Sequence, residues 1–320
     1  MPRLRLLIPA LLLLAVTAYA TMGYLIYDGL SRIGGICADN AANGPGYFEC
    51  RTDCAGWVDF DFDSYRMPRH EDVLFESRDG LTLSGWYVET DPQAPVVIVV
   101  HGYQVCKYHH DPLTVAGALS HVGYNVVLFD QRDCGDSEFE DGRSAYGSEE
   151  YLDALGAFDY LIARGFAEDR IGMHGSSLGG TVALIAFARE PRLKALFLDS
   201  PLIDARAQFS QYTGLPDLLF PAVEWAAHLV SDDDLLRHDP LEGVHRAAGR
   251  ALFAVHGTGD SVVRSSHTDR LADVAAASGV DLQVWMPEGI DHVRALPAYP
   301  AEYEARLRDY FGQHLNNSRL

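Results

Sequence analysis

The sequence predicts an α/β fold built on a doubly wound, mostly parallel sheet with helices on both faces, and two patterns support this prediction. Short continuous apolar runs recur along the chain, as expected for strands that are buried on both faces of a sheet. Segments with apolar residues at helical spacing separate them, and such alternation implies parallel βαβ crossovers. The apolar runs are residues 96–100, 125–129, 195–198 and 251–255, and the helical segments are residues 149–164, 178–189, 266–277 and 300–314.

Two regions depart from this alternation. Residues 73–75 and 81–83 flank the turn signal Arg78-Asp79-Gly80, which predicts an antiparallel hairpin. Between about residues 201 and 245 the alternation stops, and we predict short helices that are inserted as a lid. The apolar residues of this segment include Leu215, Leu218, Leu219, Phe220 and Trp225.

The composition argues against disorder and against a nucleic-acid partner. With 48% hydrophobic and 22% charged residues, the chain of 320 residues has enough apolar material for a large core. Forty-five acidic residues against 25 basic ones give a net charge of -20. This charge repels polyanions such as nucleic acids, whereas a small neutral substrate is not repelled.

The N-terminus carries a segment that is directed to a membrane. Residues 6–26 are almost all apolar and would form about 31 Å of helix, close to the hydrocarbon thickness of a bilayer. Arg3 and Arg5 favour a cytoplasmic N-terminus, with the rest of the chain on the far side. We therefore expect residues 1–30 to be a retained membrane anchor. Cleavage as a secretory signal near Ala20, within a small-x-small pattern, is the alternative.

Five cysteines are consistent with export, because an oxidising compartment permits disulfides. Three of them lie in residues 31–70, a Gly- and Asn-rich extension without sustained periodicity: Cys37, Cys50 and Cys54. One pair among the three is expected to form a disulfide, and the spacing does not say which. A zinc site is less favoured, since no nearby histidine completes the ligand set. Cys106 and Cys134 follow neighbouring predicted strands, and a disulfide between them is a further hypothesis.

Residues 175–179, Gly175-Ser176-Ser177-Leu178-Gly179, match the pattern Gly-x-Ser-x-Gly of a nucleophile elbow. The pattern alone is weak, but a predicted strand at residues 170–174 precedes it and an apolar helix follows. A strand, a sharp turn and a helix form the setting that exposes such a serine at the carboxyl edge of the sheet. Ser177 is therefore the candidate nucleophile, whereas Ser176 lacks the flanking glycines.

A serine hydroxyl needs a base to activate it and a carboxylate to orient that base. Asp260 follows the predicted strand at residues 251–255, and His292 follows another at residues 282–285. Both therefore emerge at the same edge of the sheet as Ser177, in the order Ser, Asp, His that proteins with this elbow use. We predict that His292 is the general base and that Asp260 orients it.

Other residues compete for these roles. Asp199, at the end of the preceding strand, is the alternative carboxylate, ranked lower because it leads directly into the lid. His267 lies in a helical pattern and is predicted to be exposed, and His256 is predicted to hydrogen-bond the backbone. His109-His110-Asp111 could suggest a metal, but two adjacent histidines rarely face one centre. We predict neither a metal nor an organic cofactor.

Acyl transfer also needs hydrogen-bond donors for a developing oxyanion. His101-Gly102-Tyr103 directly follows the predicted strand at residues 96–100, so the backbone N–H of Tyr103 can point at the site. The N–H of Leu178, just after the nucleophile, is the second predicted donor. A simple turn after the strand is the alternative interpretation of the first segment.

From about residue 71 to residue 320 the chain resembles the α/β-hydrolase superfamily, in particular its membrane-anchored or exported esterase- and lipase-like members. Beyond the elbow, the resemblance rests on His101-Gly102, Asp130-Gln131-Arg132-Asp133-Cys134-Gly135-Asp136-Ser137, Asp199-Ser200-Pro201 and His256-Gly257-Thr258-Gly259-Asp260. The second segment departs from the family form Asp-x-Arg-Gly-x-Gly-x-Ser at Asp133 and Cys134. The resemblance implies an eight-stranded sheet, with residues 71–320 as the catalytic domain and residues 201–245 as its lid.

These residues and the resemblance predict a serine hydrolase that cleaves a carboxylic ester through an acyl-enzyme on Ser177. A thioesterase, an amidase or peptidase, and an acyltransferase are alternatives that use the same triad. The apolar lid indicates an apolar acyl group in a small-molecule substrate, although packing against the core would use the same residues. A binding module without activity is the alternative from another class, and the complete triad argues against it. The catalytic domain is expected on the extracytoplasmic side of the membrane.

Overall fold

The computed structural model describes residues 2–33, 36–214, 216–232, 234–235, 237–247 and 249–315. Leu215, one of the apolar residues of the predicted lid, lies outside the described residues. Side chains are described from Ile8 onward, except those of residues 36 and 212, so the side chains of Arg3 and Arg5 also lie outside the description.

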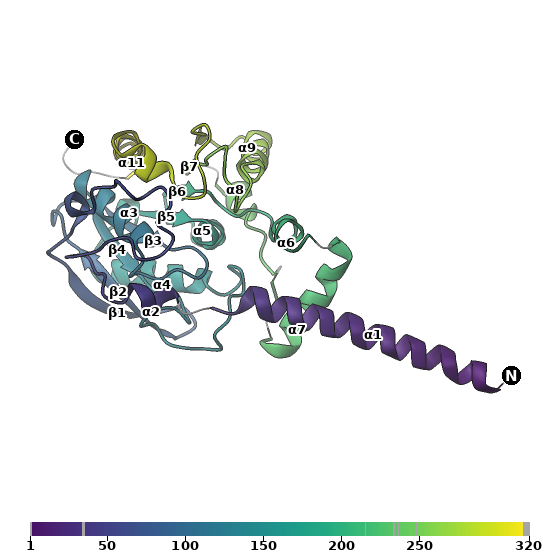
Figure 1. Cartoon of the computed structure of the whole chain (residues 1–320). Helices are drawn as coiled ribbons and strands as arrows, with labels where there is room; N and C mark the ends of the chain where they lie inside the picture. The colour runs from purple at the N-terminus through teal and green to yellow at the C-terminus, as the bar shows by residue number, and fades with distance from the viewer. Residues whose placement is uncertain are drawn as a thin grey trace.

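A single eight-stranded sheet runs through the centre of the described molecule, in the order β1-β2-β4-β3-β5-β6-β7-β8 (Figure 1). The first two strands, β1 (Glu71–Glu76) and β2 (Thr82–Val88), form the predicted antiparallel hairpin, and β2 pairs antiparallel with β4 (Asn125–Phe129). All other pairings are parallel, which confirms the doubly wound, mostly parallel sheet. The remaining strands are β3 (Val96–Val100), β5 (Ile171–Ser176), β6 (Ala195–Asp199), β7 (Ala251–Val255) and β8 (Leu282–Trp285).

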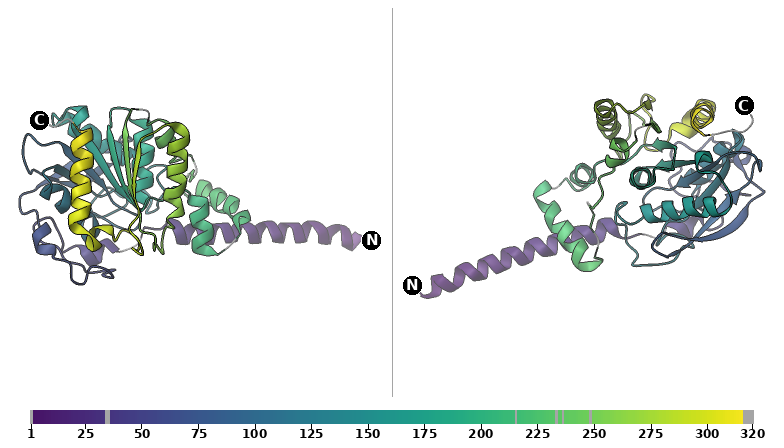
Figure 2. Two further views of the ribbon diagram at one scale, coloured as in Figure 1. Left: turned by 90° about the horizontal axis from the view of Figure 1, so that it is seen from above. Right: turned by 180° about the vertical axis from the view of Figure 1, so that it is seen from behind.

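Helices cover both faces of the sheet, and an apolar core cluster lies on each face (Figure 2). Four helices contribute to the first cluster: α4 (Tyr151–Ala163), α5 (Leu178–Arg189), α8 (Glu242–His245) and α9 (Ser266–Ser278). The second cluster contains α3 (His110–His121), the short α10 (Ala295–Ala298) and α11 (Pro300–His314). A 3-10 turn, η2 (Glu168–Arg170), leads into β5.

The cysteine-containing extension packs against the body of the protein. It includes α2 (Ile36–Asn40) and the 3-10 turn η1 (Phe62–Tyr65), and its Phe48, Tyr65 and Met67 are buried in the second core cluster. A Cβ on Gly117 of α3 would lie 2.4 Å from the carbonyl oxygen of Tyr65, so this glycine permits the close contact.

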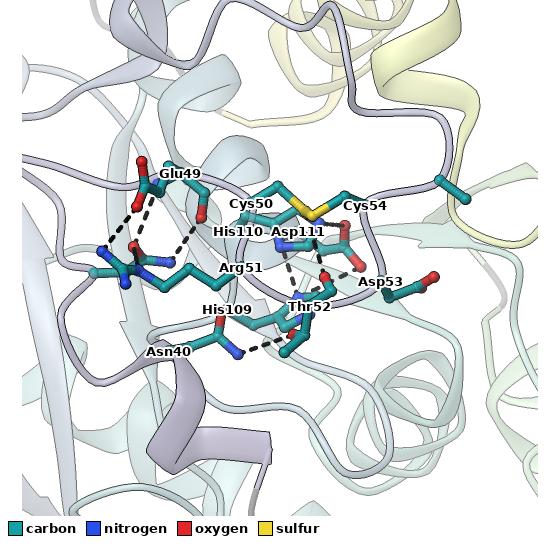
Figure 3. Close-up of a disulfide and its surroundings, with 12 residues drawn as sticks. Asn40, Glu49, Cys50, Arg51, Thr52, Asp53, Cys54, His109, His110 and Asp111 are labelled. Carbon is teal, nitrogen blue, oxygen red and sulfur yellow. Dashed lines mark hydrogen bonds and ion pairs between the residues drawn. A yellow bond between two sulfur atoms is a disulfide. The ribbon is translucent and has the colours of Figure 1, made fainter.

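Among the five cysteines, Cys50 and Cys54 form the disulfide that was expected within the extension (Figure 3). Cys106 and Cys134 are both free thiols, so the hypothesis of a disulfide between them is not supported. Cys106 instead faces Cys37, and their thiol–thiol hydrogen bond, together with burial, raises the pKa of Cys106. The extension therefore reaches across to the loop that follows β3.

Residues 201–245 contain the predicted short helices, which are α6 (Ala205–Thr213), the 3-10 turn η3 (Asp217–Leu219) and α7 (Phe220–Val230). The N-terminal helix α1 (Pro2–Ser31) passes beside α7 and then projects away from the body (Figures 1 and 2). Its residues Ile8–Ser31 are long and apolar enough to cross a membrane. By length and composition this segment fits a retained anchor and a signal sequence equally.

Candidate active site

Ser177 lies at the tight turn between β5 and α5. Its backbone has a φ of 55° and a ψ of -122°, a conformation that non-glycine residues rarely adopt and that is found where a site needs it. Its N–H donates to the carbonyl of Asp199 at 2.8 Å, which ties the turn to the end of the neighbouring strand β6. The predicted strand, sharp turn and helix are therefore present at this position.

The glycines around Ser177 have a steric explanation. A Cβ on Gly175 would lie 2.4 Å from the carbonyl oxygen of Gly179, and one on Gly179 would lie 2.4 Å from that of Val100. A Cβ on Gly102 would lie 3.2 Å from the Cβ of Ser177. A side chain at Gly175 would push α5 away from β5, and one at Gly179 would push it away from β3, so the spacing Gly-x-Ser-x-Gly reflects how closely α5 approaches both strands.

Asp260 and His292 come together at the same edge of the sheet, as predicted. Nδ1 of His292 lies 2.8 Å from Oδ2 of Asp260, whose side chain is fully buried. The other carboxylate oxygen accepts the N–H groups of Val262 at 2.9 Å and Val263 at 2.7 Å. Burial opposes the charge, but hydrogen bonds from His256 and His292 hold the pKa of Asp260 well below its usual range. An ionised Asp260 fixes a proton on Nδ1 of His292 and leaves Nε2 to accept one.

His256 contributes to the site in a way that the sequence did not reveal. Its Nε2 lies 2.9 Å from the carbonyl oxygen of Val263, which confirms the predicted backbone hydrogen bond, and 3.1 Å from Oδ2 of Asp260. Its Nδ1 lies 2.7 Å from Oγ1 of Thr268. A neutral ring with its proton on Nε2 satisfies these contacts, so His256 helps to hold the carboxylate in place. In the sequence, the spacing of four residues between His256 and Asp260 is the feature that could have indicated this contact.

The competing residues have other partners. The carboxylate of Asp199 accepts the hydroxyl of Tyr303 at 2.9 Å and that of Ser200 at 3.1 Å, and burial raises its pKa to about 6. His267 is buried, and its Nδ1 accepts the N–H of Ile203 at 3.0 Å. The prediction of an exposed His267 is wrong, because the first turn of α9 packs under the chain that leaves β6.

Ser177 and His292 line a single cavity of about 980 Å³. Leu178, the first residue of α5, has no partner for its N–H within the helix, and it lines the cavity beside Ser177. Tyr103 lines the same cavity. The five residues predicted for the site are therefore brought to one region, four of them around the cavity and Asp260 directly behind His292.

The disulfide loop forms another part of the cavity wall. Thr52 and Asp53 lie between the two bonded cysteines (Figure 3) and line the cavity. Arg294, two residues after His292, donates to the carboxylate of Asp53 at 2.6 Å and to the carbonyl of Ala55 at 2.7 Å. The extension is thus attached directly to the loop that carries His292.

A cluster of possible metal ligands lies beside this loop. The ligand atoms of His109, His110 and Asp111 lie within 4.8 Å of one another, and Figure 3 shows them next to the disulfide. However, the guanidinium of Arg294 is only 3.6 Å from Oδ1 of Asp111, and its charge opposes a cation there. The cluster therefore gives no reason to replace the prediction that the site needs no metal.

Comparisons with known proteins show the family and the fold of the chain. The sequence model of the prolyl oligopeptidase family matches residues 114–318. The chain is 27% identical over 258 residues to the uncharacterized protein YfhR of Salmonella typhi, which covers 75% of this chain and 79% of that protein. It is 32% identical over 167 residues to the polyketide transferase grgF of Penicillium, with 51% of this chain and 52% of that protein covered. The solved esterase Pf2001 of Pyrococcus furiosus has a TM-score of 0.63 at 24% identity, covering 78% and 92% of the two chains, and shares the fold.

The steric role of the elbow glycines predicts opposite effects for two helical Gly→Ala changes. Gly179→Ala should lower the free energy of unfolding by about 1–3 kcal/mol, because its Cβ would overlap backbone atoms of β3. Gly312→Ala in α11 is the matched control, since the nearest atom to its Cβ is the Tyr124 hydroxyl oxygen at 3.6 Å. It should raise stability by about 0.5–1 kcal/mol. Urea-induced unfolding measures both, and equal effects would contradict the steric explanation.

The lowered pKa of Asp260 predicts how stability depends on pH. Its carboxylate stabilises the folded state fully above the unfolded-state pKa of about 4, and this contribution is lost as the pH falls through the folded-state pKa. The excess stability of the wild type over Asp260→Asn should therefore shrink as the pH falls below about 4. Urea-induced unfolding of both proteins at a series of pH values checks this, and a difference that grows below that pH would show that the carboxylate is not stabilised as its contacts imply.

Proposed function

This chain belongs to the prolyl oligopeptidase family of α/β-hydrolases, and from that premise we propose that it is a serine hydrolase that cleaves carboxylic esters through an acyl-enzyme on Ser177. One observation carries the proposal. Ser177, on its strained turn, and His292, held by the buried carboxylate of Asp260, line the same cavity. A hydroxyl, a base and an orienting acid are the groups that acyl transfer at neutral pH requires.

In the proposed mechanism, Ser177 attacks the carbonyl carbon of the ester while Nε2 of His292 takes the hydroxyl proton. The N–H groups of Tyr103 and Leu178 stabilise the oxyanion of the tetrahedral intermediate. Collapse of this intermediate breaks the ester bond, and His292 returns the proton to the leaving alcohol. Water, deprotonated by His292, then attacks the acyl-enzyme and releases the acid. Asp260 keeps the ring oriented and stabilises its positive charge in both steps.

The walls of the cavity favour an apolar acyl group. Opposite Ser177, the cavity is bounded by side chains of α6, α7 and the chain that follows them: Phe209, Phe220, Val223 and Leu235. Its volume of about 980 Å³ is at the upper end of the range for small-molecule sites. An extended aliphatic or aromatic acyl chain would therefore find apolar contacts over most of its length. In this proposal residues 201–245 act as the lid of the catalytic domain.

Acyl transfer is a second candidate, favoured by the name of the Penicillium relative, a polyketide transferase. The same acyl-enzyme could be attacked by an alcohol or a thiol in place of water. Mass spectrometry of the products formed with and without an added alcohol acceptor distinguishes the two reactions.

We also propose that the catalytic domain lies on the extracytoplasmic side of a membrane. The apolar segment Ile8–Ser31 is preceded by Arg3 and Arg5, which favour the cytoplasm, and the disulfide between Cys50 and Cys54 is of a kind that persists in oxidising compartments.

Replacing the nucleophile tests the proposal directly. Ser177→Ala should lower the turnover of an activated ester by at least about 10⁴-fold and should abolish labelling by a fluorophosphonate probe. Thermal unfolding should change little, because the hydroxyl is not needed for the turn. The matched control is Ser176→Ala, which should still be labelled. Equal labelling of wild type and Ser177→Ala would exclude the proposed nucleophile.

The same chemical change at two carboxylates tests the assignment of the acid. Asp260→Asn should lower kcat by about 10³- to 10⁴-fold, because an amide no longer favours the productive proton position on His292. Asp199→Asn should keep kcat within about tenfold, since Asp199 is hydrogen-bonded to Tyr303 and Ser200. Steady-state kinetics on one soluble ester compares them. The assignment fails if the Asp199 variant alone loses activity.

A further inference from the structure

The C-terminal part of α1 forms a wall of the proposed catalytic cavity. Tyr27 and Leu30 line the cavity, and Tyr27 is only 1% exposed, with its hydroxyl 3.0 Å from that of Ser231. A Cβ on Gly23 would lie 2.3 Å from the carbonyl oxygen of Ala222, so α1 and α7 touch through their backbones at this point. Small residues at such a crossing are typical of helices that pack within membranes.

The end of α1 is also attached to the segment that carries the proposed oxyanion donor. The last carbonyl groups of a helix have no partner within it and need donors from elsewhere. Here the hydroxyls of Tyr103 and Tyr146 both donate to the carbonyl of Leu30, the latter at 2.8 Å. The side-chain amide of Gln104 donates to the carbonyl of Arg32 at 3.1 Å. The apolar helix is therefore part of the site and not a separate tether.

The lid presents an apolar surface to the outside. Leu218, Trp225 and Leu229, which we call the apolar ridge, are 64%, 54% and 61% exposed, and none of them lines the cavity. Their spacing of seven and four residues keeps them on one face of η3 and α7. The opposite face of α7 is buried against α1 and α6. An exposed apolar face on a helix beside an apolar anchor marks a surface that meets lipid.

The length of α1 sets the depth of this ridge. The hydroxyl of Tyr19 donates to the carbonyl of Leu218 at 2.7 Å, and residues 6–18 of the apolar segment precede this contact with the lid. At about 1.5 Å per residue these residues span about 20 Å, whereas the hydrocarbon core of a bilayer is about 30 Å thick. If α1 spans the bilayer, the turns that follow residue 18 must therefore also lie in the hydrocarbon core. These turns are the ones that contact α7.

We propose that the apolar ridge is immersed in the outer leaflet and that the substrate is a membrane-resident, long-chain acyl ester that reaches Ser177 from the bilayer through the cavity that α1 and α7 line. This proposal rests on the proposed ester hydrolysis and adds to it the source and class of substrate. One cavity connects the proposed reacting groups with the helices nearest the bilayer, because its walls include Ser177 and His292 as well as residues of α1 and α7. Trp225 would lie near the headgroups, the depth that tryptophan prefers.

The test compares two esters of one chromogenic alcohol, a butyrate in solution and a palmitate within phosphatidylcholine vesicles, using the full chain reconstituted in the same vesicles. In the double variant Trp225→Ser/Leu229→Ser, kcat/KM for the palmitate should fall at least about tenfold, while that for the butyrate should stay within about twofold. The matched control is Leu74→Ser on the edge strand β1, which is 70% exposed and far from the lid in sequence. It should change neither rate.

Each outcome of this comparison has a defined meaning. Equal losses for both esters, or no loss for either, would overturn the proposed route while leaving ester hydrolysis intact. Failure of the wild type to hydrolyse the butyrate or to react with a fluorophosphonate would instead refute the proposed function itself.

A second measurement tests immersion without catalysis. Vesicles that contain brominated phospholipids quench tryptophans that lie in the leaflet. The wild-type chain should lose a larger fraction of its fluorescence than Trp225→Phe, because Trp57 and Trp86 are buried in the protein and Trp285 is half-buried at the end of β8, with Arg306 over its ring. Equal fractional quenching of the two proteins would place α7 outside the bilayer and would overturn the proposal.

Discussion

The tight passage from β5 into α5 is the constraint on which the other features of the site depend. Ser177 has a positive φ at the point where α5 begins close against β5 and the end of β3, and this packing leaves no space for a Cβ at Gly175, which faces α5, or at Gly179, which faces β3. β3 lies between β4 and β5, so the strand order changes direction there, and an open crevice forms at the carboxyl ends of the strands. The same packing that strains Ser177 therefore brings the N–H of Leu178 and the segment after β3 to the two sides of one reacting group.

Two carboxylates at this edge of the sheet show how environment assigns different roles to the same group. Asp199 and Asp260 follow neighbouring strands, and the side chains of both are buried. Asp199 receives only two hydroxyl hydrogen bonds, so burial dominates and its pKa is raised to about 6. Asp260 receives two backbone N–H groups and lies against two imidazoles, and these contacts outweigh burial. Asp260 is therefore the carboxylate that keeps its charge over the wider pH range, and it is the one in contact with Nδ1 of His292, where an imidazolium would need an anion.

Local patterns were sufficient to predict the sheet and to bring the proposed site residues to one edge of it, whereas contacts between distant segments were not predictable. The β-branched run at residues 96–100 and the Gly-x-Ser-x-Gly spacing are determined by their own strands and turns, and the structure contains both. His267 looked exposed because its helical pattern is amphipathic, but its burial depends on the chain after β6, more than 60 residues away in sequence. The contact of Cys37 with Cys106 and that of His256 with Asp260 likewise depend on tertiary packing. The position of α1 beside the cavity has no signature in its own apolar composition.

Retention of α1 has different consequences for the cavity and for the surface of the lid. Removal of the chain up to Ala20 would leave Gly23, Tyr27 and Leu30 in place, and these residues are sufficient to close the cavity and to satisfy the hydroxyls of Tyr103 and Tyr146. The wall of the site therefore does not require a spanning helix. The proposed immersion of the apolar ridge does depend on a bilayer, because without one its three large side chains would remain in water, at a cost of about 25 cal/mol for each Å² of apolar surface. Under this proposal, the exposed apolar residues of α7 favour an anchor that is kept over one that is cleaved.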